Sequence, residues 1–452
     1  MKKLKRGLDV PINGEPAQEL KSGSKDAGDR SCRSVAILGS DYIGLKPGMQ
    51  VKEGDKVKLG QCIFTDKKNP RIKFTAPGAG TVTAINRGEK RVFQSVVIDL
   101  EGDDALTFSA YPRQKLNSLD KVDVVENLLE SGLWTSLRTR PYSKVPDPDS
   151  TPASIFVNAM DSNPLAADPS LIISADHEAF RDGLIILSRL ANKLFVCKAP
   201  SLSIPDPACS NIHVEDFTGQ HPAGLSGTHI HLLDPVSTNK TVWTINYQDV
   251  IAIGKLFLNG QINVDRIISL AGPQVQNPRL VKTRIGANLD ELVAGELLDG
   301  ENRIISGSIL SGRSSYGVSA YLGRYHQQVS VLLEGRGREL FSYLRLGIEK
   351  HSVMNMFISK LMGSKKFAFT TTVNGSERAM VPTGNFEKVM PLDILPTQLL
   401  RSLIVGDTEM AQALGCLELD EEDLSLCTYV CSGKYEYGAL LRDNLTQIEK
   451  EG

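Results

Sequence analysis

A run of short segments with alternating apolar residues, cut at close intervals by glycine, restricts the fold of residues 45–100 more than any other feature. The segments are LKPGMQVKEGDKVKLGQCIF, RIKFTAPGAGTVTAINRG and RVFQSVVIDL. Alternating apolar residues suit half-buried strands, and glycines supply the positive φ that tight turns require. The apolar positions include Val51, Val57, Leu59 and Ile63, and the glycines are Gly48, Gly54, Gly60, Gly78 and Gly80. We therefore predict an all-β module within residues 1–110.

Two strings of this module resemble the barrel-sandwich domains of biotinyl and lipoyl carriers, in which G-D-x-V-x-x-G-Q and A-P-x-x-G-x-V mark two hairpins. Here they read GDKVKLGQ and APGAGTV. A carrier presents a Met-Lys pair at an exposed hairpin tip, whereas the tip here reads DKKNPR. The module is therefore predicted to be structural rather than a carrier of a covalently attached group.

Strand and helix patterns alternate in residues 111–260. Apolar residues at helical spacing predict a helix over 119–134, with Asp120 at its N-cap and Gly132 as its stop. A strand at 154–160, a helix at 176–191 and a strand at 194–197 follow. This order is typical of a parallel α/β unit, so we predict a Rossmann-like domain.

The remaining sequence predicts three further parts. Residues 261–330 suit a small sheet followed by a helix, with Asn288 as N-cap and Glu291 at the third helical position, which indicates a β-grasp unit. Residues 331–395 are expected to form an α/β segment. Residues 396–452 carry apolar residues at helical spacing and predict a helical domain.

Composition excludes several classes of function. The 452 residues hold 51 Lys and Arg against 53 Asp and Glu, so no global positive field favours nucleic acid as a partner. The longest apolar run, VIAIGKLFL, is interrupted by Lys255 and is far shorter than the roughly 18 residues that a membrane span needs. The basic start, MKKLKRGLDV, lacks the apolar stretch of a signal peptide, so we expect a cytoplasmic protein.

Residues 131–146, SGLWTSLRTRPYSKVP, resemble the flavin-loop entry of the NADH-binding subunit of respiratory complex I and of the C subunit of the Rnf complex. In those relatives S-G-L leads into R-G-x-G-G-A-G-F-P, whose glycines let backbone N–H groups approach the flavin phosphate. This chain has Thr135, Leu137, Arg138, Thr139 and Arg140 there. We predict that the scaffold is kept and that FMN binding is lost.

The segment VNAMDSNPLAADPSLI stands where these relatives carry V-N-x-D-E-S-E-P-G, whose acidic residues face the nicotinamide nucleotide. Only Asn158, Asp161, Ser162 and Pro164 match it. A G-x-G-x-x-G fingerprint after a strand is also missing from the sequence. Direct NADH binding is therefore not expected.

Cysteines and histidines do not form a recognisable metal motif. Cys427 and Cys431 form a C-x3-C remnant of the run that ligates iron-sulfur clusters, but a cubane cluster needs four thiolates, so we interpret them as buried cysteines of a helical domain. The seven cysteines are scattered, as in reduced cytosolic proteins. We interpret His221, His229 and His231 as polar loop residues rather than zinc ligands. No catalytic, cofactor-binding or metal-binding residue is assigned.

Strings along nearly the whole chain resemble, in order, the NqrA family, the A subunits of bacterial Na+-translocating NADH:quinone oxidoreductases. They include KRGLDVPINGEP, KFTAPGAG, SGLWTSLRTRPYSKVP, HPAGLSGTHIH, INYQDVIAIGKLF, SLAGPQVQNPRLV, NGSERAMVPTGNFEKVMPLDILPT and ELDEEDLSLCTYVCSGKYEYG. The resemblance implies a peripheral subunit, on the cytoplasmic side of the inner membrane, of a six-subunit complex that couples electron transfer from NADH to ubiquinone with sodium export. It also implies that the missing flavin and cluster ligands distinguish this family from its cofactor-bearing relatives.

The same resemblance implies that the complex uses NADH, FAD, FMN, riboflavin, iron-sulfur centres and Na+. It implies that this subunit binds no redox cofactor. It also implies that this subunit contacts the five other subunits of the complex (B to F), chiefly the membrane-embedded B subunit. Ubiquinone is a candidate ligand near that boundary. A quinone site combines an apolar slot with one or two hydrogen-bond donors, and one cluster offers donors beside aromatic rings. Its members are Trp134, Arg138, Arg140, Tyr142 and Lys144. The alternative is a loop packed against the sheet with solvated arginines.

Overall fold

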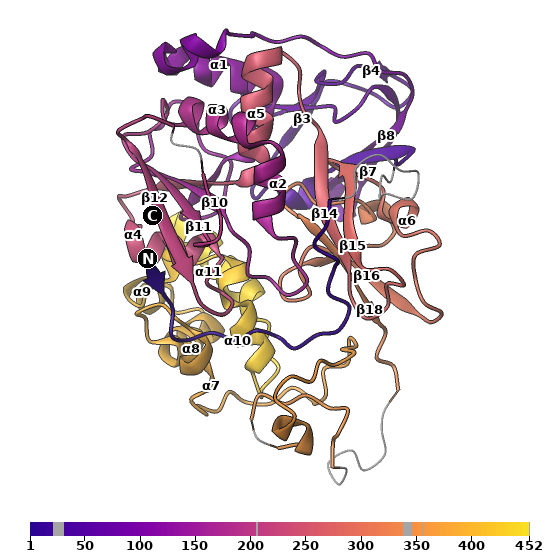
Figure 1. Cartoon of the computed structure of the whole chain (residues 1–452), viewed down its shortest axis with the longest axis vertical. Helices are drawn as coiled ribbons and strands as arrows, with labels where there is room; N and C mark the ends of the chain where they lie inside the picture. The colour runs from indigo at the N-terminus through magenta and orange to yellow at the C-terminus, as the bar shows by residue number, and fades with distance from the viewer. Residues whose placement is uncertain (21–30, 205–206, 338–345, 355, 452) are drawn as a thin grey trace.

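The computed structural model describes residues 1–20, 31–204, 207–337, 346–354 and 356–451. Its described strands form four sheets, and a group of helices follows at the C-terminal end of the chain. Figure 1 shows the β module and the α/β domain in the upper half, the third sheet beside them, and the yellow C-terminal helices below. The predicted multidomain class, with both α/β and α+β parts, is confirmed.

The β module consists of a four-stranded sheet, in the order β2-β8-β7-β4, and a three-stranded sheet, in the order β3-β5-β6. Side chains between the sheets are buried, and Phe64 and Phe74 stack at 4.6 Å between ring centroids. Gly80 shows why glycine is needed here, because a Cβ at its φ of 156° would lie 1.9 Å from the Asp99 carbonyl oxygen. The strands are β2 (Ser34–Leu38), β3 (Pro47–Met49), β4 (Lys56–Val57), β5 (Cys62–Asp66), β6 (Lys73–Thr75), β7 (Gly80–Arg87) and β8 (Phe93–Leu100).

The α/β domain holds a six-stranded sheet in the order β1-β12-β11-β10-β13-β9. Within this sheet, β1, β12, β11, β10 and β13 run parallel to one another, and β9 is antiparallel to its neighbour β13. The strands are β1 (Lys2–Lys3), β9 (Arg138–Arg140), β10 (Ile155–Ala159), β11 (Leu194–Lys198), β12 (Ile212–Thr218) and β13 (Val242–Asn246). The helices are α1 (Lys121–Ser131), α2 (Pro169–Ala175), α3 (His177–Leu187), α4 (Ser226–Leu233) and α5 (Tyr247–Asn259).

Helices cover both faces of this sheet because successive residues of each buried strand are apolar. Ile155 and Val157 of β10 belong to the core that contains α3 and α5, whereas Phe156 belongs to a second core with Ile230 of α4. Helices α3 and α5 approach closely, since a Cβ at Gly183 would lie 2.1 Å from the Val250 carbonyl oxygen. The predicted parallel α/β unit is confirmed, and α1 ends at Gly132, whose φ is 78°.

The β-grasp part is a five-stranded mixed sheet in the order β15-β14-β18-β16-β17, with one short helix. The Asn288 side chain caps that helix by accepting hydrogen bonds from the backbone N–H groups of Asp290 and Glu291, as predicted. The elements are β14 (Asp265–Ala271), β15 (Arg279–Arg284), α6 (Leu289–Leu292), β16 (Asn302–Ser306), β17 (Arg313–Ser314) and β18 (Gln328–Leu333).

The C-terminal part is helical, as predicted, and encloses its own core around Leu399, Cys427 and Leu441. Its helices are α7 (Asn385–Val389), α8 (Pro396–Val405), α9 (Thr408–Ala413), α10 (Ser425–Val430) and α11 (Tyr437–Glu451). Between β18 and α7 the described residues hold the short 3-10 helix η7 (Ile358–Leu361) and single β-bridges, such as Leu333 with Thr370, but no further strand. The α/β character of 331–395 stays a prediction; its described residues include the end of β18 and helix α7.

The first residues of the chain lie apart from the two sheets of the β module. Strand β1 pairs with β12 in the α/β sheet, and Val10 and Ile12 lie in the core of the C-terminal helices. The N-terminal stretch therefore connects two other parts of the fold before the β module begins. Its basic residues gave no apolar periodicity from which this course could be predicted.

Among the described residues, no helix is both long and apolar enough to cross a bilayer.

Candidate functional site

The carboxyl ends of β10 and β13 meet beside a cavity of about 120 Å³. From β10 the chain passes to β11 and β12 on one side of the sheet and then returns to β13 on the other. In an open α/β sheet, ligands bind in the crevice where the strand order reverses in this way. The cavity therefore occupies the position at which this fold class binds nucleotides.

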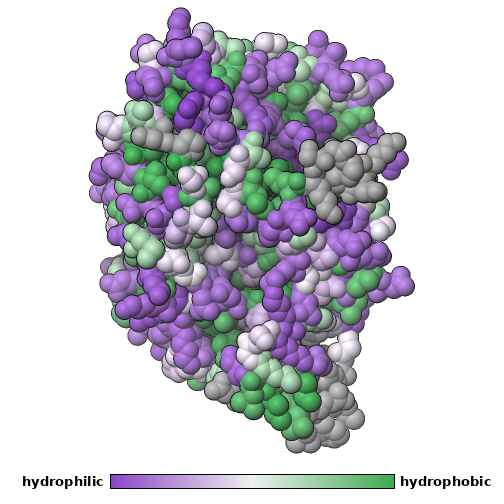
Figure 2. Space-filling view, in the orientation of Figure 1, coloured by the Kyte–Doolittle hydropathy of each residue, from purple (hydrophilic) through white to green (hydrophobic). Residues whose placement is uncertain are grey.

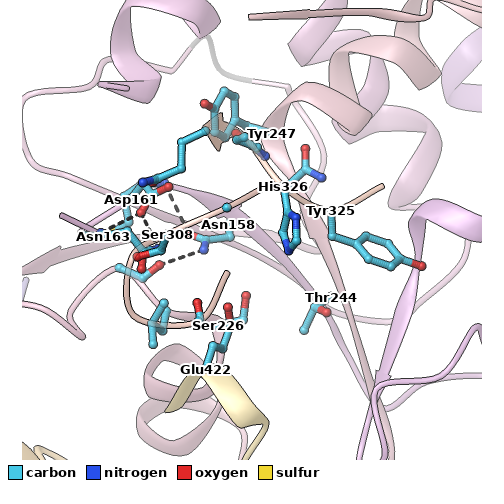
Figure 3. Close-up of a pocket in the computed structure, with 18 of the residues that line it drawn as sticks. Asn158, Asp161, Asn163, Ser226, Thr244, Tyr247, Ser308, Tyr325, His326 and Glu422 are labelled. Carbon is cyan, nitrogen blue, oxygen red and sulfur yellow. Dashed lines mark hydrogen bonds between the residues drawn. The ribbon is translucent and has the colours of Figure 1, made fainter. Parts of the chain in front are cut away.

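Three parts of the chain line this cavity (Figure 3). The α/β domain contributes Asn158 and Asp161 after β10, and the β-grasp part contributes Ser308 and His326. Glu422 enters from the C-terminal part, drawn at the bottom of the view. The site is thus a junction of three domains.

Burial shifts the pKa values of Asp161 and His326, two titratable side chains that line the cavity. Burial raises the pKa of Asp161 to about 6, although the carboxylate accepts hydrogen bonds from the Asn163 backbone N–H at 2.8 Å and its Nδ2 at 2.9 Å. Burial lowers the pKa of His326 to about 3, and the cations of Arg313 and Arg138 add to this effect. His326 is therefore neutral at physiological pH.

Arg138 is the one sequence-predicted candidate that lines the cavity. Its guanidinium carbon lies 4.6 Å from the centroid of the Tyr325 ring, a cation–π contact. The Tyr325 hydroxyl donates to the Thr135 carbonyl oxygen at 2.8 Å. Arg138 is thus held against the β-grasp part and is not a freely solvated side chain.

Arg140 corrects the expectation of solvated arginines, because it is completely buried. Its Nη1 donates to the Asp423 Oδ2 at 3.0 Å and its Nη2 to the Asp420 Oδ2 at 3.1 Å. Arg442 also donates to the Asp420 Oδ1, at 2.8 Å, and Ser143 to the Asp420 Oδ2, at 2.6 Å. These residues form the C-terminal joint, which connects β9 to the C-terminal helices.

Burial opposes ionisation of the carboxyl groups in this joint, and the arginines compensate unequally. Burial alone would raise the pKa of Asp420, but Arg140, a hydrogen bond with Glu421, Arg138 and Arg442 together outweigh it and hold that pKa well below its ordinary value. Burial raises the pKa of Glu422 to about 7 against the opposing effects of Arg138 and Arg140. It also raises the pKa of Asp423. With Glu421, Glu422 and Arg138 included, four carboxyl groups face three arginines in this joint.

The other predicted candidates do not meet at one surface. Trp134 is buried in the core, where its Nε1 donates to the Pro146 carbonyl oxygen at 2.9 Å and its ring meets Trp243 edge-on at 5.4 Å. Tyr142 is partly buried with a φ of 76°, and its carbonyl oxygen accepts from Arg442 at 2.9 Å. Lys144 pairs with Glu449 of α11. The cluster is spread over the core, the cavity and the C-terminal joint.

The histidines also differ from the prediction of polar loop residues. His229 and His231 lie on α4, and His221 and His229 are buried, which lowers the pKa of both to about 4. The His231 Nδ1 lies 2.7 Å from the Glu418 Oε2. Gly227 also lies inside α4, where a Cβ would lie 2.3 Å from the Asp423 carboxylate oxygens.

The interpretation of Cys427 and Cys431 as buried cysteines of the helical domain is confirmed. Burial raises the pKa of Cys427 to about 12, and the same cause raises that of Cys416 to about 12. The Cys431 Sγ lies 3.3 Å from the Tyr437 hydroxyl. These thiols pack as small apolar groups.

Fold and site together define a class: a multidomain α/β protein with a cavity at the point where the strand order of its parallel sheet reverses. Three family models match the chain, the NqrA N-terminal barrel-sandwich hybrid domain at residues 2–101, the NqrA second alpha/beta domain at 119–262 and the NQRA C-terminal domain at 267–316. Among the most similar relatives is a protein of Pseudomonas aeruginosa, 63% identical over 452 residues and 100% of both chains. A relative in Saccharophagus degradans is 62% identical over 100% of both chains, and one in Pasteurella multocida is 58% identical over 99% of both. All three carry the name of the A subunit of Na(+)-translocating NADH-quinone reductase.

The chain belongs to the NqrA family, the A subunits of the Na+-translocating NADH-quinone reductase. Among solved structures, an NAD+-reducing NiFe hydrogenase in the H2-reduced state shares 14% identity over 49% of each chain, with a TM-score of 0.36. That score is too low to support a shared overall fold.

Residues that sequence reasoning missed include Asp420, Glu422, Asp423, Tyr325 and His326. The acidic run ELDEEDLS was a usable signal, since closely spaced carboxylates need cations nearby if they are buried. Nothing in the sequence showed that β9 would provide the partner.

Proposed function

We propose that this chain is a cofactor-free peripheral subunit, on the cytoplasmic side of the bacterial inner membrane, of a complex that passes electrons from NADH to ubiquinone and exports sodium. In this proposal the subunit supports quinone reduction and complex formation through the membrane-embedded B subunit. The observation that carries the proposal is the filled flavin loop in a chain that matches its NqrA relatives over their full length.

The backbone of the filled loop is engaged in its own hydrogen bonds rather than aimed at a flavin phosphate. The Leu137 N–H donates to the Trp134 carbonyl oxygen at 3.2 Å and the Thr139 N–H to that of Lys144 at 2.8 Å. Arg138 and Arg140 pair with Thr244 and Val242 in the β-ladder. A phosphate cradle requires N–H groups that point at the ligand, so these residues do not fit FMN.

The segment after β10 is likewise occupied by its own hydrogen bonds. The Asn158 Nδ2 donates to the Gly224 carbonyl oxygen at 2.8 Å, and the Gly224 N–H donates to the Ser162 Oγ at 2.8 Å. Asp161 accepts two bonds from Asn163. A nicotinamide nucleotide would have to displace these contacts, which supports a subunit that receives no electrons from NADH directly.

The cysteines of the C-terminal part do not fit an iron-sulfur cluster either. A cubane cluster takes four thiolates, and this part holds Cys416, Cys427 and Cys431, all buried. The flavins and iron-sulfur centres that the family implies would then belong to other subunits.

For the quinone boundary, Tyr142 and Lys144 are the predicted residues that remain partly exposed beside the C-terminal part, while Arg138 lines the cavity. We propose that these three contribute to the boundary with the membrane subunit and ubiquinone, and that Trp134 and Arg140 hold them in place. The C-terminal joint would then set the geometry of that boundary.

The test is a pair of assays on the assembled complex with glycine at positions 137–140 of this subunit. We expect loss of quinone reduction while NADH oxidation by an artificial acceptor persists, because electron entry lies in other subunits. The control carries Arg71→Met, an exposed arginine of the β module that pairs with Glu126 and Asp149. Unchanged quinone reduction in the glycine variant would show that the loop is only structural. NADH oxidation by the isolated subunit would favour a free-standing dehydrogenase instead.

A further inference from the structure

Exposed apolar side chains concentrate in one short stretch of the chain, which we call the apolar lobe (the described residues of 346–362). Of the 22 large hydrophobic residues that are exposed in the described structure, seven lie in this lobe. An even spread over the chain would place about one there. They are Leu346, Ile348, Met354, Met356, Ile358, Leu361 and Met362.

Hydrogen bonds within the apolar lobe define its conformation. The Ile358 N–H donates to the Leu346 carbonyl oxygen at 3.0 Å, which closes the loop, and η7 ends with a bond from the Met362 N–H to the Ser359 carbonyl oxygen at 3.0 Å. The Ser359 hydroxyl donates to the Lys350 carbonyl oxygen. With 87% of Leu361 and 69% of Met356 exposed, this fold presents the apolar side chains outward.

The lobe lies at one end of the molecule. In Figure 1 its brown segment projects below the sheets, and Figure 2 shows a green apolar patch at the same end.

Lysines lie in and next to the apolar lobe. Residues 346–366 contain Lys350, Lys360, Lys365 and Lys366 against one acidic residue, Glu349. Lys365 pairs with Glu349 and Lys366 with Glu15, so the four lysines outnumber the two carboxylates. Burial lowers the pKa of His351, which therefore adds no charge at neutral pH. The lobe is thus apolar with a net positive rim.

This composition favours a lipid surface over a protein partner. Protein interfaces are enriched in aromatic residues, Met and Arg and are depleted of lysine. The Met side chains of the lobe would suit either surface, whereas its lysines and the lack of an exposed large aromatic side chain among its described residues favour lipid. Segments that lie in the membrane interface combine aliphatic side chains with lysines that contact anionic headgroups. Long lysine side chains can also keep their charge in the headgroup layer while their stems contact lipid.

We propose that the apolar lobe inserts into the headgroup region of an anionic bilayer and so orients this subunit on the membrane. The inference rests on the proposed function, which places the chain at the membrane, but it adds a direct lipid contact. It requires no transmembrane helix.

The test measures binding of the purified full chain to vesicles of phosphatidylglycerol and phosphatidylcholine, compared with phosphatidylcholine alone. We expect binding to the anionic vesicles that weakens with salt. The double variant Met356→Glu with Leu361→Glu should bind at least about tenfold more weakly, since two charges replace inserted side chains. Lys360→Ala should weaken binding about fivefold. The matched control is Val122→Glu with Val405→Glu, whose side chains are 69% and 75% exposed outside the lobe.

A tryptophan at position 361 gives a direct readout. Trp134 and Trp243 are buried, so Leu361→Trp should add an exposed emission that shifts to the blue when anionic vesicles are added. Native chain that ignores anionic vesicles, or a double variant that binds them equally well, would overturn the proposal. A double variant that binds vesicles normally but no longer joins the other subunits would identify the lobe as a protein interface. Failure of the native chain to join the complex at all would instead contradict the proposed function.

Discussion

Two buried ionic joints hold the α/β domain to its neighbours, and they are built in opposite ways. In the C-terminal joint, buried Arg140 faces Asp420, Glu422 and Asp423, with Arg442 also on Asp420, so carboxyl groups outnumber arginines. In the second, which we call the β-grasp joint, buried Asp249 of α5 faces two arginines, Arg266 of β14 and Arg324.

The difference determines how each joint responds to pH. Burial alone would raise the pKa of Asp249, but Arg324 and Arg266 outweigh it and hold that pKa below its ordinary value. Its contribution to stability is therefore present above the unfolded pKa and lost only in strong acid. Glu422 has a raised pKa of about 7, so its ionisation opposes folding as pH rises from its unfolded pKa through 7. We infer that the contribution of the C-terminal joint to stability changes with pH near neutrality, whereas that of the β-grasp joint stays constant there.

The largest expected effect is that of Asp249→Asn. It leaves Arg266 and Arg324 buried without their carboxylate, which costs on the order of 3–5 kcal/mol in the free energy of unfolding. The loss should be equal at about pH 5 and about pH 8, because arginine keeps its charge throughout. Urea unfolding of the purified chain measures it, with the exposed Asp265→Asn as control, whose side chain is 55% exposed. A loss that grows or shrinks between the two pH values would break the contrast between the joints.

Arg140→Met should destabilise the chain by about 3 kcal/mol at about pH 8 and by less at about pH 5. Arg442 continues to contact Asp420, and protons taken up by Asp423 and Glu422 relieve the remaining charge at lower pH. The same urea series measures this dependence, with Arg71→Met as an exposed control that should leave the midpoint unchanged. A pH-independent loss would mean that the carboxyl groups of this joint do not share protons as described.

The smallest expected effect is a gain. Glu422→Gln should stabilise the chain by about 1 kcal/mol at about pH 8 and change little at about pH 5, since the substitution removes a charge that burial disfavours. The figure is modest because the Glu422 side chain keeps 27% exposure, which reduces the penalty on its charge. Thermal melting at both pH values measures the gain, and the exposed Glu126→Gln serves as control. Destabilisation at about pH 8 would show that the ion pair with Arg140 outweighs burial.

Local patterns predicted most of the fold, whereas contacts between distant segments were not predictable. Helix α1 with its Gly132 stop, the parallel pair β10 and β11, and the Asn288 cap depend on neighbouring residues, so the sequence contained their signals. The burial of Arg140 depends on Asp420, which lies 280 residues away in the chain. The seven exposed apolar residues of the lobe were likewise indistinguishable in sequence from a small core.

In the candidate site, too, local strings were predictable and contacts between distant segments were not. The prediction of a filled flavin loop came from a local string of residues, and in the structure residues 138–140 form β9, whose Arg140 belongs to the C-terminal joint. The cavity needs residues from three domains, so sequence reasoning found Arg138 but not Glu422 or His326.

The flavin and iron content of the freshly purified chain, followed by titration with FMN, tests the central claim most directly. Residues 138–140 form β9, Arg140 pairs with Asp423, and the C-terminal cysteines are buried. We therefore expect a colourless protein without flavin or iron-sulfur absorption, and no FMN binding at micromolar concentrations. Stoichiometric FMN or iron, or micromolar affinity for FMN, would contradict the account.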